Sequence, residues 1–233
     1  MNKILVITSI TNDKDKLLDP PKKFEGCDYV AFVDKIVDDV EIWEQKLIYN
    51  FSFIDKYKDR RNAKIYKLLS SLMFPQYDYI IWEDGNHQLK MDPQKIFEEY
   101  GNDFNLLLFK HPDRVCTYQE MNAVAQWKLD ELPNIQNQFN FYKGVGMPEK
   151  WGLFEMSTFI IKNTPIINTF QLMWYEQICK FTSRDQISLP FVLWKLGNKI
   201  NFKILKGYSN LFSMDGQNTG NEYFEDQGKH LKY

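Results

Sequence analysis

One polar segment stands out because it follows an apolar stretch directly. Residues 77–82 run into Glu83, Asp84, Gly85 and Asn86. Carboxylate and amide oxygens are the ligands that Mg²⁺ and Mn²⁺ prefer, and a bound metal can neutralise the charge that grows on a leaving diphosphate. The segment therefore predicts either a divalent-metal site facing a nucleoside diphosphate or an ordinary acidic turn, because Asp-Gly is itself a turn signal.

A basic cluster lies beside the apolar face of a helix expected at about residues 60–72. Its members are Arg60, Arg61, Lys64 and Lys67. Arg61 and Lys64 could bind a phosphate or a base, since charge-assisted hydrogen bonds to phosphate are strong. The alternative is a solvated helix face that binds no ligand.

Two further polar residues lie near the ends of the first two expected strands, residues 3–9 and 29–34. Ligands of open α/β sheets bind at the carboxyl ends of the strands. Thr8 and Asp34 are therefore candidates for nucleotide contacts, with Asp34 accepting from a ribose hydroxyl or a base. As a single residue, Asp34 is equally well explained as a loop cap.

A histidine and an arginine follow the strand expected at residues 105–110. His111 could be a metal ligand, and Arg114 could clamp a phosphate or a carboxylate. A lone histidine is more often structural, so both readings stay open. The other two histidines, His87 beside the acidic turn and His230 near the C-terminus, are further metal-ligand candidates.

The segment Ser183–Gln186 has capping-box spacing and predicts the start of a helix. Within it, Asp185 could orient or deprotonate an acceptor hydroxyl, or it could simply stabilise the positive end of the helix dipole. Glu155 is a second carboxylate that could face an acceptor.

These residues need a scaffold, and apolar strands alternate with helices over most of the chain. The pattern predicts a mainly parallel sheet covered by helices on both faces. The expected strands are residues 3–9, 29–34, 77–82, 105–110, 157–162 and 202–205, and the expected helices are about 60–72, 93–100, 119–129, 166–179 and one beginning at 183.

Composition narrows the class of protein further. A length of 233 residues fits one large α/β domain, and a net charge of −2 without a long basic run argues against a nucleic-acid partner. The three cysteines, Cys27, Cys116 and Cys179, are odd in number and predict free thiols in a reducing compartment, the cytoplasm. The sequence has neither the features of a signal peptide nor a 20-residue apolar run, so we expect no membrane span.

Four segments together resemble one known family in the same order along the chain. They are Arg61–Lys64, Trp82–Gln88, His111–Arg114 with Cys116 and Glu120, and Ser183–Ser188 with Pro190 and Val192. The sequence resembles the glycosyltransferase-like domain family that was first described as a domain of unknown function, which includes plant mucilage-related proteins and bacterial and viral capsule or glycan proteins. The resemblance covers about residues 4–196.

The resemblance implies a GT-A fold in a single domain over residues 1–233. A Rossmann-like nucleotide-binding half would span about 1–110, an acceptor half about 111–212, and a polar tail 213–233. It also implies a divalent metal, Mn²⁺ or Mg²⁺, held by Asp84 and Asn86, with His111 as the expected third ligand. Glu83 stands where the family usually has an apolar residue.

The expected reaction is hexosyl transfer from a nucleoside-diphosphate sugar, with UDP favoured, to a hydroxyl of a glycan or glycoconjugate in polysaccharide or capsule synthesis. Asp185 and Glu155 are the residues expected to handle the acceptor. The residues expected to contact the donor are Thr8, Asp34, Arg61, Lys64, Glu83, Asp84 and Arg114.

Three alternatives remain open at this point. The chain could be a non-catalytic module that binds a nucleotide sugar or a glycan. It could be a metal-dependent lipid amidase, since some plant relatives carry a ceramidase label, or a scaffold associated peripherally with a glycan assembly complex. Having only three histidines disfavours the amidase, whose metal-bound water typically needs more histidine ligands.

Overall fold

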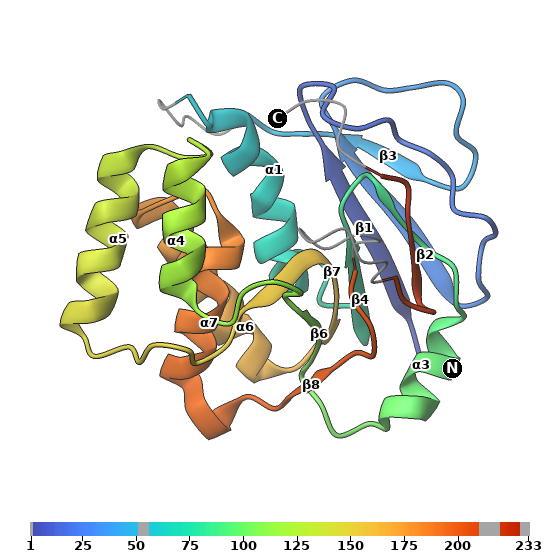
Figure 1. Cartoon of the computed structure of the whole chain (residues 1–233). Coiled ribbons are helices and arrows are strands. Elements are labelled where there is room, and N and C mark those ends of the chain that lie inside the picture. The colour runs from blue at the N-terminus through green and yellow to red at the C-terminus, as the bar shows by residue number, and fades with distance from the viewer. Residues whose placement is uncertain (1, 51–55, 210–219, 229–233) are drawn as a thin grey trace.

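The computed structural model describes residues 2–50, 56–209 and 220–228. Its centre is a seven-stranded sheet with the order β3-β2-β1-β4-β7-β6-β8 (Figure 1). Only β7 runs antiparallel to its neighbours, so the expected mainly parallel sheet is confirmed. The strands are β1 Ile4–Ile10, β2 Cys27–Val33, β3 Glu44–Leu47, β4 Tyr79–Glu83, β6 Leu106–Lys110, β7 Phe154–Lys162 and β8 Phe202–Ile204.

Side chains that alternate along the strands build two separate cores. On one face, residues such as Leu5, Ile7 and Trp82 pack under most of the helices. On the other face, Val6 and Ile81 pack under α3 (Pro93–Tyr100) and a small sheet of β5 (His87–Leu89) and β9 (Phe224–Asp226). Because neighbouring strand residues point to opposite faces, two adjacent polar residues at a strand end also point in opposite directions.

Six helices in the described part of the chain, two from its first half and four from its second, cover the first face of the sheet (Figure 1). Among them α6 contacts α1, α2 and α7, and α4 contacts α5 and α7. These helices are α1 Lys58–Leu68, α2 Ser70–Met73, α4 Thr117–Gln126, α5 Leu132–Gly144, α6 Pro165–Lys180 and α7 Asp185–Leu196, followed by a short 3₁₀ turn, η1 Gly197–Lys199.

The residues at the helix ends explain where α3 begins and ends, and they contradict the predicted capping box at the start of α7. The Asp92 side chain caps α3 by accepting from Gln94 N at 3.0 Å, and Gly101 ends the helix with φ +67°. The predicted capping box is wrong, because the hydroxyl of Ser183 donates to Asp130 Oδ2 at 2.6 Å instead of capping α7. Arg184 is the N-cap of α7 and makes no side-chain capping bond.

Two expectations about helices and the tail also change. The helix expected over residues 60–72 breaks at Leu69, where the backbone leaves helical geometry (φ −118°, ψ 19°). The tail expected to be polar contains β9, which pairs with β5, and Tyr223 and Phe224 are each 1% exposed. Residues 210–219 and 229–233 lie outside the described part. In the described residues, no helix is both long and apolar enough to cross a membrane.

Candidate active site

Lys67 lies at the centre of a charged cluster at the carboxyl end of β4. This lysine on α1 is only 3% exposed. Its ammonium is 3.2 Å from Asp84 Oδ1 and 2.8 Å from Asp185 Oδ2, and it donates to the carbonyl of Met156. It also lies 5.0 Å from the centre of the Trp82 ring. Lys67 thus joins the end of β4, the strand β7 and the start of α7.

Asp185 is a buried carboxylate held between two lysines. It pairs with Lys64 as well as with Lys67, and Trp174 Nε1 donates to its backbone carbonyl at 3.1 Å. Burial by itself raises the pKa of Asp185, but the Lys64 and Lys67 ammonium groups hold that pKa well below its ordinary value. A carboxylate with so low a pKa is suited to position the lysines and unsuited to take a proton as a general base.

The turn that carries Asp84 is fixed on three sides. Asp84 N donates to Ser157 O at 2.7 Å, and Trp82 Nε1 donates to Asp84 Oδ1 at 2.8 Å. Gly85 packs so closely that a Cβ there would lie 2.7 Å from Ile10 Cδ1 and 2.8 Å from Asp15 Cβ. This turn therefore needs glycine for close packing, and it places Asp84 on the face that α1 covers.

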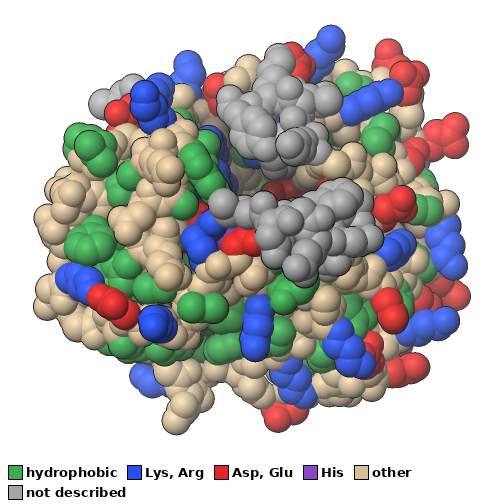
Figure 2. Space-filling model, in the orientation of Figure 1, with side chains coloured by type: hydrophobic (Ala, Val, Ile, Leu, Met, Phe, Trp, Pro, Cys, Tyr) green, Lys and Arg blue, Asp and Glu red, His purple; other side chains and the backbone are tan. Residues whose placement is uncertain are grey.

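Three more basic side chains, those of Arg60, Lys14 and Arg184, lie near this centre. Arg60 donates to Leu129 O at 2.8 Å and to Ser183 Oγ at 3.1 Å, and burial followed by the charge of Arg184 lowers its pKa to about 10. Lys14, in the loop after β1, has its pKa lowered by burial and by Arg184, although Asp84 opposes the change. Figure 2 shows basic, acidic and histidine side chains gathered around a hollow in one face of the molecule.

Three residues expected to contact the donor point away from this cluster. Arg61 is 4% exposed and donates to the carbonyls of Ile178 and Phe181, which end α6, so it caps a helix. Thr8 and Glu83 lie on the opposite face of the sheet and are each 1% exposed. Strand alternation sends Thr8 and Glu83 into the other core, so neither side chain reaches the cluster around Lys67.

Glu83 is a buried carboxyl with one described hydrogen-bond donor. Leu89 N donates to Glu83 Oε2 at 2.8 Å. Burial raises the pKa of Glu83 to about 8, and this hydrogen bond opposes the shift only partly. The carboxyl that replaces the family's apolar residue therefore belongs to the fold and does not reach the site.

Asp34 and Asn86 are both engaged in holding loops. Asp34 is exposed and accepts from Asn12 N at 2.6 Å, as the loop-cap alternative predicted. Asn86 Nδ2 donates to Gly228 O at 2.6 Å, and its Oδ1 lies 2.9 Å from His87 Nδ1. Asn86 thus fastens the C-terminal segment to the acidic turn.

His111 and Arg114 form a second polar cluster. Arg114 Nε donates to Glu120 Oε2 at 2.7 Å, and its NH2 lies 2.9 Å from His111 Nε2. Burial, with the charge of Arg114 adding to it, lowers the pKa of His111 to about 4, so the ring is neutral. Gln186 Nε2 donates to Glu120 Oε1 at 2.9 Å, which connects this cluster to the start of α7 next to Asp185.

Glu155 was expected to face an acceptor, and the structure corrects this. It is 2% exposed and accepts from Ser209 N at 2.6 Å. It pairs with Phe109 across β6 and β7, on the strand face opposite to the one that Phe154 and Met156 share in the first core. Glu155 therefore holds the backbone at Ser209.

Each of the three predicted metal ligands has hydrogen-bond partners of its own among the described residues. The described residues contain no group of three or more His, Cys, Asp or Glu side chains placed to hold a metal ion. His111 belongs to the second cluster, Asn86 binds Gly228 O, and Asp84 already accepts from Lys67 and Trp82. A dication on Asp84 would lie beside the Lys67 ammonium, and like charges repel strongly in a buried site. His230 lies outside the described residues.

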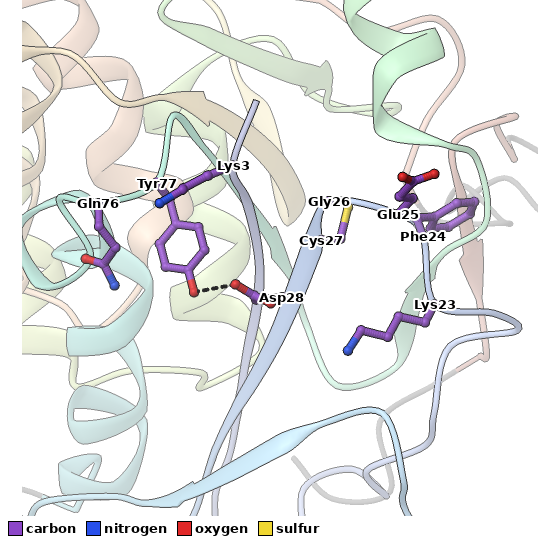
Figure 3. A pocket seen from close by; sticks show the side chains of 9 residues that line it. All are labelled: Lys3, Lys23, Phe24, Glu25, Gly26, Cys27, Asp28, Gln76 and Tyr77. Atoms are coloured by element: carbon purple, nitrogen blue, oxygen red, sulfur yellow. Dashed lines mark hydrogen bonds between the residues drawn. The ribbon is translucent and has the colours of Figure 1, made fainter. Parts of the chain in front are cut away.

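A separate hollow of about 670 Å³ lies at the opposite end of the strands, where β1 and β2 begin. In Figure 3 its lining includes Lys3, Cys27 and Tyr77, and the Tyr77 hydroxyl donates to Asp28 Oδ2 at 2.8 Å. Burial raises the pKa of Cys27 to about 12, so its thiol stays protonated. Open α/β sheets bind their ligands at the carboxyl ends of the strands, and this hollow lies at the amino-terminal ends.

Sequence reasoning gave too little weight to three basic residues: Lys14, Lys67 and Arg184. Lys67 was recognised only as part of the basic cluster. Arg60, Lys64 and Lys67 are spaced four and then three residues apart, which places them on one face of α1. That spacing was the available signal. Nothing in the sequence indicates that the loop containing Lys14 folds back to the same place.

The fold of this chain is shared with solved structures. The fold is that of glycosyltransferases: it matches the apo structure of the WbbM bifunctional glycosyltransferase with a TM-score of 0.52 at 10% identity, covering 88% of this chain and 39% of that one. The mannosyltransferase Ktr4p of S. cerevisiae matches with a TM-score of 0.50 at 13% identity, covering 88% of this chain and 69% of that one.

The sequence then gives the family. Residues 2–213 match the TOD1/MUCI70 glycosyltransferase-like domain, and the chain belongs to this family. It is 32% identical to the probable hexosyltransferase MUCI70 of Arabidopsis thaliana over 176 aligned positions, which cover 71% of this chain and 30% of that protein. It is 23% identical to the alkaline ceramidase TOD1 of the same plant, covering 87% of this chain and 51% of that protein. The chain thus spans about half or less of the length of these curated relatives.

Proposed function

We propose that this chain transfers a hexose from a nucleoside-diphosphate sugar to a hydroxyl of a glycan or glycoconjugate. UDP is the favoured nucleoside diphosphate of the donor. The observation that carries the proposal is the cluster of Lys64 and Lys67 with Asp84 and Asp185, at the end of the sheet where α/β proteins bind ligands. Family membership and the likeness to a probable hexosyltransferase support the same reaction.

In this reaction the bond from the sugar C1 to the diphosphate oxygen breaks, and the acceptor oxygen forms a new bond to C1. The proton of the acceptor hydroxyl passes to the leaving diphosphate or to water. Negative charge grows on the leaving diphosphate, so fixed ammonium groups nearby stabilise the transition state. Asp185 acts as a positioning residue, because it holds Lys64 and Lys67 in place. No step is written through the predicted metal; Asp84 and Asn86, on the turn after β4, are the side chains that would hold it if it binds. A cytoplasmic place and an acceptor in capsule or other polysaccharide synthesis stay predictions.

The test is release of nucleoside diphosphate from UDP-, GDP- and dTDP-hexoses in the presence of mixed glycan acceptors. We expect turnover with one nucleotide family, and a loss of kcat/KM of at least about a hundredfold in Lys64→Met, because removing one preorganised charge-stabilising group costs about 10²–10³. Lys58→Met, at an exposed lysine on the same helix, is the matched control and should retain activity.

The same preparation is assayed for hydrolysis of ceramide, because one relative is named an alkaline ceramidase. Fatty-acid release from ceramide without any nucleotide-sugar turnover would contradict the proposal and favour the amidase. Binding of the nucleotide without turnover of any donor would favour a non-catalytic module.

A further inference from the structure

Two basic side chains beside the cluster have no partner in the described structure. The side chains of Lys14 and Arg184 make no hydrogen bond or ion pair with any residue that the structure describes, and Arg184 Nε is buried without a hydrogen-bond partner. In contrast, Lys64 and Lys67 are both paired with Asp185. A buried donor without a partner is costly, so Arg184 Nε calls for an explanation.

The two unpartnered side chains flank the charged cluster: Asp15, next to Lys14, packs against Gly85, and Arg184 directly precedes Asp185, which pairs with Lys67. The charge of Arg184 lowers the pKa of Lys14, the charge of Arg60 does the same, and Asp84 acts in the opposite direction. Arg184 comes from the N-cap of α7 and Lys14 from the loop after β1, so two distant parts of the chain place like charges together. Such an arrangement becomes favourable when an anion lies between the charges.

We propose that Lys14 and Arg184 form the clamp that binds the diphosphate of the donor, and that this clamp neutralises the diphosphate without a divalent metal ion. The inference rests on the proposed function and names how the donor is held. It also agrees with the contacts of Asp84, whose carboxylate already accepts from Lys67 and Trp82.

Arginine and lysine bind phosphate in different ways, and the two together suit a diphosphate. The guanidinium of Arg184 can donate two parallel hydrogen bonds to one phosphate group, while the ammonium of Lys14 acts as a mobile point charge on the other. Behind them, Asp185 holds Lys64 and Lys67 in place, and burial lowers the pKa of Lys64 to about 7 although Asp185 opposes the change. An anion bound there gives Arg184 Nε the partner that it lacks.

Calorimetric titration of the full chain with UDP, and separately with inorganic pyrophosphate, tests the clamp in buffer containing EDTA. We expect wild-type protein to bind both probes in EDTA, and Lys14→Met and Arg184→Met each to weaken binding at least tenfold. Arg184→Lys should recover part of the loss, and Lys199→Met, at an exposed lysine of η1, should bind as wild type does. Without a ligand, the melting temperatures of the two Met variants should equal or exceed that of wild type, since each removes a repelling charge.

The outcomes separate this inference from the proposed function. Wild-type binding that disappears in EDTA and returns with Mn²⁺ or Mg²⁺ would overturn the metal-free clamp and leave the transferase proposal standing. Binding in EDTA that neither Met variant weakens would place the diphosphate elsewhere. If no nucleotide binds with or without metal, the proposed function fails together with the clamp.

Discussion

Lys67 shows how single residues set the character of the site. A buried lysine keeps its charge only when carboxylates surround it, and Asp84 and Asp185 raise the pKa of Lys67 although burial acts to lower it. Removing one partner of such a buried pair is costly because the other charge is left uncompensated. The cluster is therefore a fixed arrangement of charge that exists before any ligand binds.

Glu83, one residue before Asp84, gives a prediction about pH at the same scale. The folded chain keeps the proton of Glu83 up to about pH 8, whereas the unfolded chain releases it near the ordinary carboxyl value of 4.5. Between these values the folded state binds more protons, so the stability of wild type falls as pH rises. We expect Glu83→Gln to remove this loss and to be more stable than wild type at pH 8 by roughly 3–5 kcal/mol.

Urea unfolding at pH 5, 6.5 and 8 measures the difference, and Glu98→Gln, at an exposed position on α3, is the control. The Gln amide oxygen can still accept from Leu89 N, so the hydrogen bond that holds Glu83 remains possible. An equal pH dependence in wild type and Glu83→Gln would show that Glu83 is ionised in the folded state.

At the residue scale the sequence predicted which segments build the site, but not which side chains reach it. The acidic turn and the start of α7 both contribute, through Asp84 and Asp185. Glu83 and Glu155 were misplaced because alternation fixes only the relative direction of neighbours. The face of the sheet against which α1 packs depends on contacts between distant residues, and a local sequence pattern does not predict them.

At the scale of elements, Arg61 connects α1 to α6, although it was expected to bind the donor. Arg61 donates to carbonyls at the C-terminal end of α6, where helix carbonyls lack intrahelical partners. We expect Arg61→Met to lower the free energy of unfolding by about 2–4 kcal/mol, because charge-assisted hydrogen bonds are lost and buried carbonyls stay unpaired. Nucleotide affinity should not change at temperatures where the variant is folded, and thermal unfolding together with UDP titration measures both quantities.

The contrary result would be informative. If Arg61→Met kept its melting temperature and lost UDP binding, Arg61 would belong to the donor site after all. Lys58→Met, on the exposed side of α1, controls for a general loss of positive charge from this helix.

The strongly patterned elements were the predictable ones. Strands β1, β2, β4 and β6 and helices α3, α4 and α6 lie where apolar runs and helix-start signals placed them. Helix α5 was missed because only Ile135, Gln138 and Tyr142 of its residues are buried, which is too few for a clear apolar stripe. The short strands β5 and β9 were missed because each has three residues and gains its stability from the other.

At the scale of the whole molecule, the C-terminal strand completes the second core. Tyr223 and Phe224 pack with Leu89 and Phe109 in that core, although the family match ends at residue 213. We expect a chain that ends after Ser213 to lose at least about 5 kcal/mol of stability or to aggregate, because deleting a single buried Phe side chain already costs about 3–5 kcal/mol.

A chain that ends after Gly228 retains β9 and serves as the matched control. Equilibrium unfolding in urea compares the two. Equal transition midpoints would mean that β9 contributes nothing to the stability of the domain.

The sheet order has a consequence for how the chain is made. Strand β7 lies between β4 and β6, so β6 cannot join the sheet until residues 154–162 have been synthesised. The contacts of Arg61 with Phe181 and of Lys64 with Asp185 join residues 120 and 121 positions apart. A nascent chain leaving the ribosome therefore carries an open strand edge at β4 and a lysine-rich helix without its counter-charges. Such an intermediate needs protection from aggregation until the last third of the chain has emerged.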